Sequence, residues 1–398
     1  MFGRNIRILY VTSYSLHGRC FGGTLRVLNL ARLLSRVGEV LPVIATSEHI
    51  DPDDLDKTRQ EFGTVRLIRV HNDTLRGWGT RLRFELDPTF LNTHFERSSD
   101  LDKSSMHAAI CDSDVVWVHT LRTANLFRIY RWPHSILDVD NVPSLLYASN
   151  AKIETVSTRR LLDRRMSLIW HRREQLLQDR FNVISVCSEN DRQYLGGALD
   201  VHVVPNGFAP PPGPPPRSPS LPARLGFIGL LEYGPNRDGI EWFIKHVWPQ
   251  IKRNASLTRL RLIGSGSDRG FSLMGPDIDG LGYVEDPTNE IASWSAMIVP
   301  IRFGGGTRVK IAEAFSRMCP VVSTKFGAFG YGVRDGAELL LADSVEEFSA
   351  ACLRIMADQP LGKKLSENAW ERLQGEWTWD AIAKAVEKTV ESCLHSSC

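Results

Sequence analysis

A proline-rich segment divides the chain near its middle. Residues 205–224, PNGFAPPPGPPPRSPSLPAR, contain nine of the chain's 21 prolines. Proline lacks a backbone N–H and fixes φ, so neither a helix nor a central strand can cross this segment. The composition is typical of a semi-rigid linker. Because the chain has 398 residues, each side of the linker is long enough to bury a core of its own.

Both halves alternate short β-branched runs with helical periodicity, which is typical of parallel sheets covered by helices. The first half predicts strands over 6–11, 40–45, 65–70, 115–119, 135–139 and 183–188, with helices from Thr24 and over 156–178. The second half predicts strands over 225–229, 259–263, 297–301, 320–324 and 338–342, with helices over 237–251, 307–317, 345–357 and 361–374. The stretch 76–106 has poor periodicity and predicts an irregular insertion.

The expected organisation is therefore an α/β chain with two domains and a terminal helix. The first domain covers 1–205, the linker 206–224, the second domain 225–376, and the last helix lies within 377–398. In open parallel sheets, ligands bind beyond the carboxyl ends of the strands. The loops after the predicted strands are thus the places to look for functional residues.

Composition excludes several classes of protein. Hydrophobic residues at 42% and charged residues at 24% fit a globular chain, and a net charge of +2 gives no overall attraction for nucleic acid. No apolar run approaches the ~18–20 residues of a membrane span, and the N-terminus has no cleavage-like site, so a cytoplasmic location is expected. The seven cysteines form no C-x-x-C pair, which argues against a zinc site or a disulfide framework.

The strongest candidate for anion binding is a glycine loop between a predicted strand and a predicted helix. Its residues are Gly304, Gly305, Gly306 and Thr307. Glycine amides can approach a phosphate closely, and the helix that follows directs its positive end to the same point. Arg308 and Lys310 fall in the expected first turn, where cations oppose the helix dipole unless they share an anion. The alternative is a flexible loop with two solvated cations.

Further along the same predicted helix, Glu313 is a candidate for sugar recognition. A carboxylate at this position suits a bidentate hydrogen bond to a vicinal diol such as ribose. The alternative is a structural ion pair with Arg317, which follows at i+4.

The first half offers two weaker candidates. Gly22 and Gly23 precede a predicted helix and repeat the glycine-loop pattern, although two adjacent glycines are weak evidence alone. His119 ends a predicted strand, which places it toward a ligand crevice; the alternative is a structural histidine. The glycines at 264, 266 and 270 have the wrong spacing for a dinucleotide fingerprint and no helix pattern follows them, so NAD is not predicted.

Several motifs together resemble the retaining glycosyltransferases of family 4, which have the GT-B architecture. These motifs are GGTLRVLNLARLL (22–34), VVPNG (203–207), GFIGLLEYGPNRDGIEWF (226–243), GYVED (282–286) and GGGTRVKIAEAFSRMCPVVST (304–324). The resemblance implies two facing Rossmann-like domains, with a nucleoside diphosphate sugar held mostly by the second. It also implies that the last helix crosses back to the first domain.

The resemblance also assigns roles to residues. Gly22 and Gly23 match a loop near the diphosphate and transferred sugar, and His119 matches a histidine that contacts the donor sugar. Glu313 matches the second glutamate of an E-x7-E motif, the ribose ligand. Tyr283 and Val284 lie in the segment that matches the loop beside the nucleotide base.

One departure from the family pattern bears on the chemistry. The first glutamate of E-x7-E would stand where this chain has Gly305, so its carboxylate is absent. We therefore expect Arg308 and Lys310 to neutralise the diphosphate, which gains charge as it leaves, and we predict them with His119 as the catalytic residues.

The predicted reaction is glycosyl transfer with retention of anomeric configuration to a glycan, lipid-linked or small-molecule acceptor. No cofactor and no metal are expected, since the only D-x-D-like pair, Asp138 and Asp140, resembles a structural strand turn of the family. Two alternatives remain: a GT-B nucleotide-sugar epimerase, which needs no acceptor, and a non-catalytic nucleotide-sugar-binding protein.

A basic segment in the first half suggests a further partner. Residues 158–180 carry seven arginines and three acids among apolar residues. Such a surface fits contact with anionic lipid at the inner face of a membrane. The alternative is a solvated helix packed on its domain by one apolar face.

Overall fold

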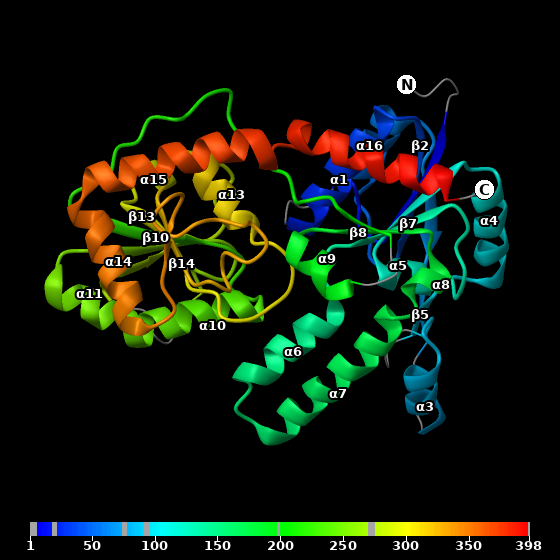
Figure 1. The fold of residues 1–398 in the computed structure, drawn as a ribbon, viewed down its shortest axis with the longest axis horizontal. Helices are drawn as coiled ribbons and strands as arrows, with labels where there is room; N and C mark the ends of the chain where they lie inside the picture. The colour runs from blue at the N-terminus through cyan, green and yellow to red at the C-terminus, as the bar shows by residue number, and fades with distance from the viewer. Residues whose placement is uncertain are drawn as a thin grey trace. The chain divides into compact units, whose positions relative to one another are not determined.

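The computed structural model describes residues 6–17, 22–73, 78–90, 95–196, 200–269 and 275–396. The chain forms two compact units (Figure 1). Unit 1 comprises Met1–Asn206 together with Ile382–Cys398, and unit 2 comprises Gly207–Ala381. The division after Asn206 lies one residue beyond the predicted end of the first domain.

Unit 1 is built on a seven-stranded parallel sheet in the order β3-β2-β1-β6-β7-β8-β9. The strands are β1 (Arg7–Thr12), β2 (Glu39–Thr46), β3 (Arg66–Arg69), β6 (Val115–His119), β7 (Ser135–Val139), β8 (Val183–Val186) and β9 (Val201–Val203). A separate antiparallel pair joins β4 (His71–Asp73) to β5 (Phe95–Arg97). The register places Thr12 opposite His119 at the carboxyl ends of β1 and β6.

The helices of unit 1 connect these strands. They are α1 (Gly22–Ser35), α2 (Pro52–Phe62), α3 (Trp78–Leu86), α4 (Asp100–Cys111), α5 (Leu121–Leu126), α6 (Pro143–Ile153), α7 (Ser157–Glu174), α8 (Leu177–Arg180) and α9 (Glu189–Leu195). The last helix of the chain, α16 (Trp379–His395), begins in unit 2, but its residues from Ile382 onward cluster with unit 1. That part of α16 buries Ile382, Val386, Val390 and Cys393.

Unit 2 contains a six-stranded parallel sheet in the order β12-β11-β10-β13-β14-β15. The strands are β10 (Arg224–Ile228), β11 (Arg259–Ile263), β12 (Ile278–Gly280), β13 (Ala296–Val299), β14 (Val321–Ser323) and β15 (Leu340–Leu341). The helices are α10 (Gly234–Trp242), the π-helix η1 (Phe243–Val247), α11 (Trp248–Asn254), α12 (Thr288–Ala292), α13 (Val309–Ser316), α14 (Val345–Ala357), α15 (Gln359–Arg372) and the π-helix η2 (Leu373–Trp377). Helices α10 and α11 lie on one face of the sheet, and α13 and α15 on the other (Figure 1).

The predicted α/β class with two Rossmann-like parallel sheets is confirmed. The best-predicted helix is α14, whose bounds match the prediction because Ser344 and Glu347 form a capping box at its start. Among the described residues, no helix has the length and apolarity needed to cross a bilayer.

Three local predictions need correction. The helix predicted over 156–178 is two helices, because the chain turns after α7 and lets Leu177 enter the core of unit 1. The helix predicted from Thr307 begins at Val309, since Arg308 has an extended backbone. The described part of the 76–106 stretch is not irregular: it holds α3, β5 and the start of α4, which Ser99 caps.

Part of the proline-rich segment is held against unit 2 by hydrogen bonds and is not a free linker. Its second part is bound to unit 2, since the backbone N–H groups of Ser218 and Ser220 donate to the carbonyls of Ala292 and Ser293. Arg217 Nη1 donates to the carbonyl of Ile291 at 2.8 Å. These bonds leave only the part before Arg217 without such an anchor on α12.

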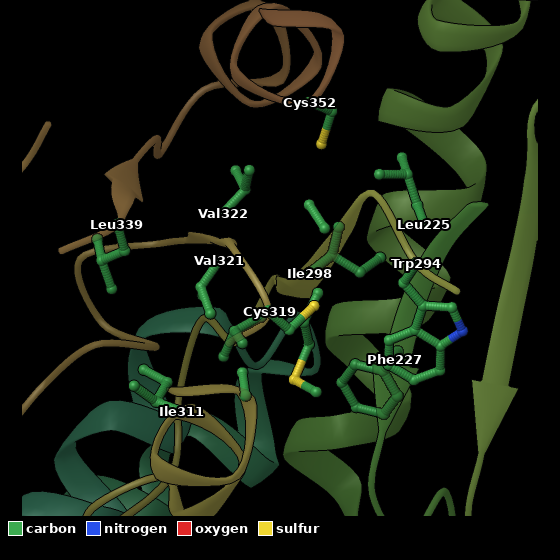
Figure 2. Close-up of a cluster of buried hydrophobic side chains, with 14 of the residues drawn as sticks. Leu225, Phe227, Trp294, Ile298, Ile311, Cys319, Val321, Val322, Leu339 and Cys352 are labelled. Carbon is green, nitrogen blue, oxygen red and sulfur yellow. The ribbon is translucent and has the colours of Figure 1, made fainter. Parts of the chain in front are cut away.

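The core of unit 2 depends on a close approach between β10 and Trp294. Figure 2 shows the Trp294 ring beside Phe227, within a cluster that spans the sheet and its helices. Trp294 is fully buried and its Nε1 donates to Glu290 Oε1 at 2.9 Å. A Cβ at Gly226 would lie 2.0 Å from the indole, so only glycine fits this position.

Gly226→Ala should therefore destabilise unit 2. The added methyl group must displace the indole, and overpacking of this kind costs about 1–3 kcal/mol. Urea denaturation monitored by tryptophan fluorescence would measure the loss. Gly375→Ala is the control, because nothing lies within 4 Å of the Cβ it would add. Equal stability of the two variants would contradict the packing constraint.

Candidate functional site

The candidate residues of unit 2 gather where the sheet changes its direction of winding. From β10 the chain winds outward through β11 and β12, then returns to the other side of β10 with β13. The loops after β10 and β13 therefore leave in opposite directions and open a crevice between them. The glycine loop 304–307 follows β13, and residues 229–236 follow β10.

The glycine loop has the backbone geometry that its sequence predicted. Gly304 has φ +124 and Gly306 has φ +65, conformations that favour glycine. The helix α13 begins directly after the loop, and no described side chain caps it at Arg308. The first N–H groups of α13 are thus directed toward the loop, as an anion site requires.

Arg308 organises the loop itself. Its Nη1 donates to the carbonyl of Gly305 at 2.6 Å and also to that of Gly306. Its own carbonyl accepts from Tyr331 Oη at 3.1 Å. Since the side chain is buried, Arg308 is part of the loop framework as well as a positive charge beside it.

The Lys310 side chain extends from α13 to the residues that follow β10. Its Nζ donates to Asn236 Oδ1 at 2.7 Å and sits 4.0 Å from the centroid of the Phe227 ring. A Cβ at Gly229 would approach this Nζ to 2.9 Å, so the absence of a side chain there makes room for the ammonium. Burial, with repulsion from Arg308, lowers the pKa of Lys310 well below its usual value. An ammonium held this way favours a bound anion.

Glu313 lies on α13 within reach of Arg317. Its Oε1 is 3.4 Å from Arg317 Nη1, so the structural ion pair that was the alternative to a ribose ligand is present. Burial raises the pKa of Glu313, and the Arg317 and Lys310 charges only partly offset it. The ion pair does not exclude a ribose role, because a carboxylate accepts several hydrogen bonds.

The segment of Tyr283 and Val284 follows β12, and β11 and β10 lie between that strand and β13. Gly282 N–H donates to Ser267 Oγ at 2.9 Å, and its carbonyl accepts from Gly264 N–H at 2.8 Å. Tyr283 is 70% exposed. The loops after β11 and β12 are thus bound together at one end of the sheet, with an exposed aromatic ring available for stacking on a base.

Unit 1 has the corresponding reversal between β1 and β6, and His119 ends β6 there. His119 Nδ1 is 2.7 Å from Asp138 Oδ2 at the end of β7. Arg26 of α1 binds the same carboxylate twice, through Nε at 3.0 Å and Nη2 at 2.6 Å. All three side chains are buried. The network extends through Arg26 Nη1 to the carbonyl of Pro205 and to Asn206 Oδ1.

This network determines which nitrogen of His119 is available. Burial would raise the pKa of Asp138, but the Arg26 charge and the hydrogen bonds from His119 and Arg26 hold it well below its usual value. An ionised carboxylate only accepts, so Nδ1 of His119 carries a proton. Its Nε2 is buried and has no hydrogen-bond partner among the described residues. In the neutral ring, Nε2 is therefore an acceptor suited to a hydroxyl group.

The other predicted residues of unit 1 are only partly described. Gly22 and Gly23 form the first residues of α1, and the loop residues 18–21 that precede them lie outside the described residues. Their contribution to an anion site stays a prediction.

Sequence reasoning assigned no function to Arg26 or Asn236 and treated Asp138 as structural. Arg26 falls on the apolar stripe of α1, four residues before Leu30, and a cation on such a stripe signals a buried partner. Asp138 is the next-to-last residue of a wholly buried strand, which is a comparable signal. Asn236 had no such signal, because its contact with Lys310 joins segments 74 residues apart.

Comparison with known proteins supports the class of fold. Residues 222–358, all in unit 2, match the family model described as Glycosyl transferases group 1. A Klebsiella pneumoniae protein, described as an uncharacterized 44.6 kDa protein in the cps region, is 21% identical over 174 residues. That match covers 41% of this chain and 44% of the relative, so it spans less than half of either protein.

Solved structures match along nearly the whole chain. Sucrose-phosphate synthase from Thermosynechococcus elongatus is 16% identical over 95% of this chain and 96% of its own, with a TM-score of 0.66. TarM from S. aureus, in a complex that includes UDP, is 9% identical over 97% and 99%, with a TM-score of 0.68. HepE from Anabaena, in complex with UDP and glucose, is 13% identical over 97% and 99%, with a TM-score of 0.61. These similarities show a GT-B fold.

Asp138→Asn should destabilise unit 1 strongly, because it leaves the buried Arg26 guanidinium without its counter-ion. Breaking a buried ion pair in this way costs about 3 kcal/mol or more. Asp140→Asn is the matched control, since Asp140 is partly exposed and accepts from the uncharged Cys187 and Asn206 side chains. Chemical denaturation of both variants measures the difference, and similar losses would contradict the central role of the ion pair.

Lys310→Met should stabilise the ligand-free protein by about 1 kcal/mol, because it removes a partly buried, desolvated ammonium. Folded Lys310 binds fewer protons than unfolded Lys310 between its lowered pKa and its usual one, so wild-type stability rises with pH across that window. The advantage of the variant should therefore shrink as the pH is raised. Melting curves between neutral and alkaline pH test this, with the exposed Lys245→Met as control. A pH-independent difference would contradict it.

Proposed function

We propose that the protein is a glycosyltransferase that uses a nucleoside diphosphate sugar as donor. The observation that carries the proposal is the pairing of the 304–306 glycine loop with the partly buried Lys310 at the winding reversal of unit 2. This arrangement is suited to a diphosphate, and it lies within the 222–358 segment that matches the family model. Uridine donors are the first choice, since the similar structures of TarM and HepE contain UDP.

The groups of the site would act mainly by electrostatic stabilisation. As the bond to the sugar breaks, the leaving diphosphate gains negative charge. The loop amides and Lys310 would bind this charge, and Arg308 would hold the loop in shape while adding its own positive field. Because these groups are fixed before the substrate binds, little reorganisation is needed at the moment of reaction.

Donor recognition is proposed to involve three further groups. Glu313 would bind the ribose hydroxyls, and Tyr283 with Val284 would flank the base. His119 Nε2 would accept a hydrogen bond from a hydroxyl group of the donor sugar. The hydrogen bond between His119 Nδ1 and Asp138 holds the imidazole ring in the orientation for this contact. With Gly305 in place of a carboxylate, sugar recognition depends on such neutral contacts.

We further propose retention of configuration, with the acceptor attacking the face from which the diphosphate leaves, and no requirement for metal or cofactor. A sugar-containing acceptor is favoured by the likeness to TarM, whose solved complex contains α-GlcNAc-glycerol together with UDP. Activity that persists in excess chelator, with an unchanged anomeric configuration in the product by NMR, is the expected outcome. An inverted product or loss of activity on chelation would contradict these points.

Nucleotide binding is the first test. UDP and UDP-sugars should raise the melting temperature of the wild type, since a ligand of the folded state stabilises by about 2.7 kcal/mol at a hundred times its Kd. Arg308→Ala and Glu313→Ala should lose this shift. Arg317→Ala is the control that separates the two roles of Glu313, because it removes the ion pair and keeps the carboxylate. Equal losses in the Glu313 and Arg317 variants would favour a structural role for Glu313.

The same preparation discriminates the alternatives. An epimerase would release a free sugar from the donor without any acceptor, and a binding protein would leave the donor intact. If no nucleoside diphosphate shifted the wild-type melting temperature at any concentration, the glycosyltransferase proposal would fail, and the glycine loop would be a site for another anion.

A further inference from the structure

Helices α6 and α7 form a hairpin that lies to one side of the unit 1 sheet (Figure 1). The two helices lie side by side, and Ser167 Oγ of α7 donates to the Ser144 carbonyl of α6 at 2.9 Å. None of the groups proposed to bind the donor belongs to this hairpin, residues 143–174. The proposed donor binding therefore does not account for the outer surface of the hairpin.

The hairpin exposes large apolar side chains in one place. Four such residues of unit 1 fall within 13 residues of its tip and of α7: Val156, Leu161, Leu162 and Leu168. Leu161 and Leu168 are 69% and 61% exposed and are seven residues apart, on one face of the helix. Arg164 and Arg165 follow Leu161 by three and four residues, and Arg172 follows Leu168 by four, so they complete that face.

The charge of the hairpin contrasts with that of the whole chain. Residues 143–174 contain seven Lys or Arg and three Asp or Glu, a net charge of +4, whereas the whole chain has a net charge of +2. One of these acids, Glu174, is buried. Arg165 is already paired with Glu85 of α3. The surface thus combines exposed leucines with a local excess of cations that the rest of the chain does not have.

A groove between the helices adds a concave part to this surface. It has a volume of about 720 Å³ and is lined by Lys152 of α6 and by Arg160, Arg164 and Leu168 of α7, together with small residues. Arg160 donates to the Glu154 carbonyl through Nε and Nη2. Lys152 and Arg164 are exposed at its edge. A groove with cations on its rim and a leucine beside it is complementary to a phosphate that carries an apolar chain.

The base of the hairpin is held firmly. Glu174 Oε1 accepts from Ser144 N–H at 2.8 Å, and its other oxygen accepts from Ser144 Oγ, which joins the end of α7 to the start of α6. Arg173 Nη1 donates to the Phe90 carbonyl at 2.9 Å and joins the hairpin to the rest of unit 1. The exposed face is therefore presented on a preorganised support.

We propose that the α6–α7 hairpin docks on a bilayer that contains anionic phospholipid. Leu161 and Leu168 enter the boundary between headgroups and acyl chains. Lys152 and Arg164 at the rim of the groove, and Arg172 further along α7, bind headgroup phosphates. The combination of apolar insertion and basic attraction is what interfacial helices use. The proposal goes beyond the transfer reaction and does not depend on it.

Co-sedimentation of the full chain with vesicles tests the proposal. At low ionic strength, binding is expected to vesicles containing phosphatidylglycerol and not to vesicles of phosphatidylcholine alone. The double variant Leu161→Ser/Leu168→Ser should reduce the partition coefficient about tenfold, and Arg164→Gln/Arg172→Gln should reduce it similarly while weakening its salt dependence. Because all four positions are exposed, the variants should keep the wild-type melting temperature.

Matched controls distinguish binding through this surface from nonspecific binding of the protein to vesicles. Leu101→Ser changes an 80% exposed leucine on α4, and Arg59→Gln changes an exposed arginine on α2, so both should bind vesicles as the wild type does. Absence of wild-type binding to phosphatidylglycerol vesicles would overturn the proposal, as would hairpin variants that bind equally well. Competition by glycerol 3-phosphate that matched the effect of vesicles would instead indicate a soluble phosphate ligand. Nucleotide thermal shifts should be unchanged in every variant, which keeps this test separate from that of the proposed reaction.

Discussion

The strand order of the two sheets is the constraint on which the rest of the structure depends. In each unit the first strand lies inside the sheet, and the chain winds first to one side and then to the other. At the reversal the loops after the two neighbouring strands leave in opposite directions, so the carboxyl ends of these strands can present polar groups to a ligand. His119 in unit 1 and the glycine loop in unit 2 occupy these equivalent positions. The sites are thus a result of topology, and the residues there determine the chemistry.

Positive charge at the two reversals is neutralised to different extents. In unit 1, the Arg26 guanidinium is neutralised by Asp138, and the pair orients His119. In unit 2, Lys310 contacts an amide oxygen and an aromatic face, neither of which carries a full negative charge. The Glu313 carboxylate offsets its charge only in part, since Glu313 is paired with Arg317. The first arrangement stabilises the domain and fixes a ring. The second leaves the positive charge of Lys310 incompletely neutralised. A bound anion can neutralise it, and without a ligand this charge lowers the stability of unit 2.

The fold was largely predictable, because buried parallel strands contain continuous apolar runs and β1, β6 and β13 stand out as such. Short strands such as β15 and small helices such as α12 gave weaker patterns. At the site, the glycine loop and Lys310 could be singled out because glycine runs and first-turn cations have local meaning. The Arg308 contacts with the loop carbonyls, the Asn236 contact and the Asp138 network could not, since each depends on the path of the chain between distant segments. The ion pair of Glu313 with Arg317 was foreseen as an alternative because i+4 spacing is visible in the sequence.

The placement of α16 has a consequence for synthesis of the protein. Unit 1 buries side chains of this helix from Ile382 onward, yet that part of the helix follows all 175 residues of Gly207–Ala381 in the chain. A ribosome adds roughly 5–20 residues per second, so unit 1 waits on the order of 10 to 35 seconds after its own sheet is complete before its last helix is available. During that interval, the apolar surface that will receive Ile382, Val386 and Val390 is open. The first domain to emerge is therefore the last to be finished.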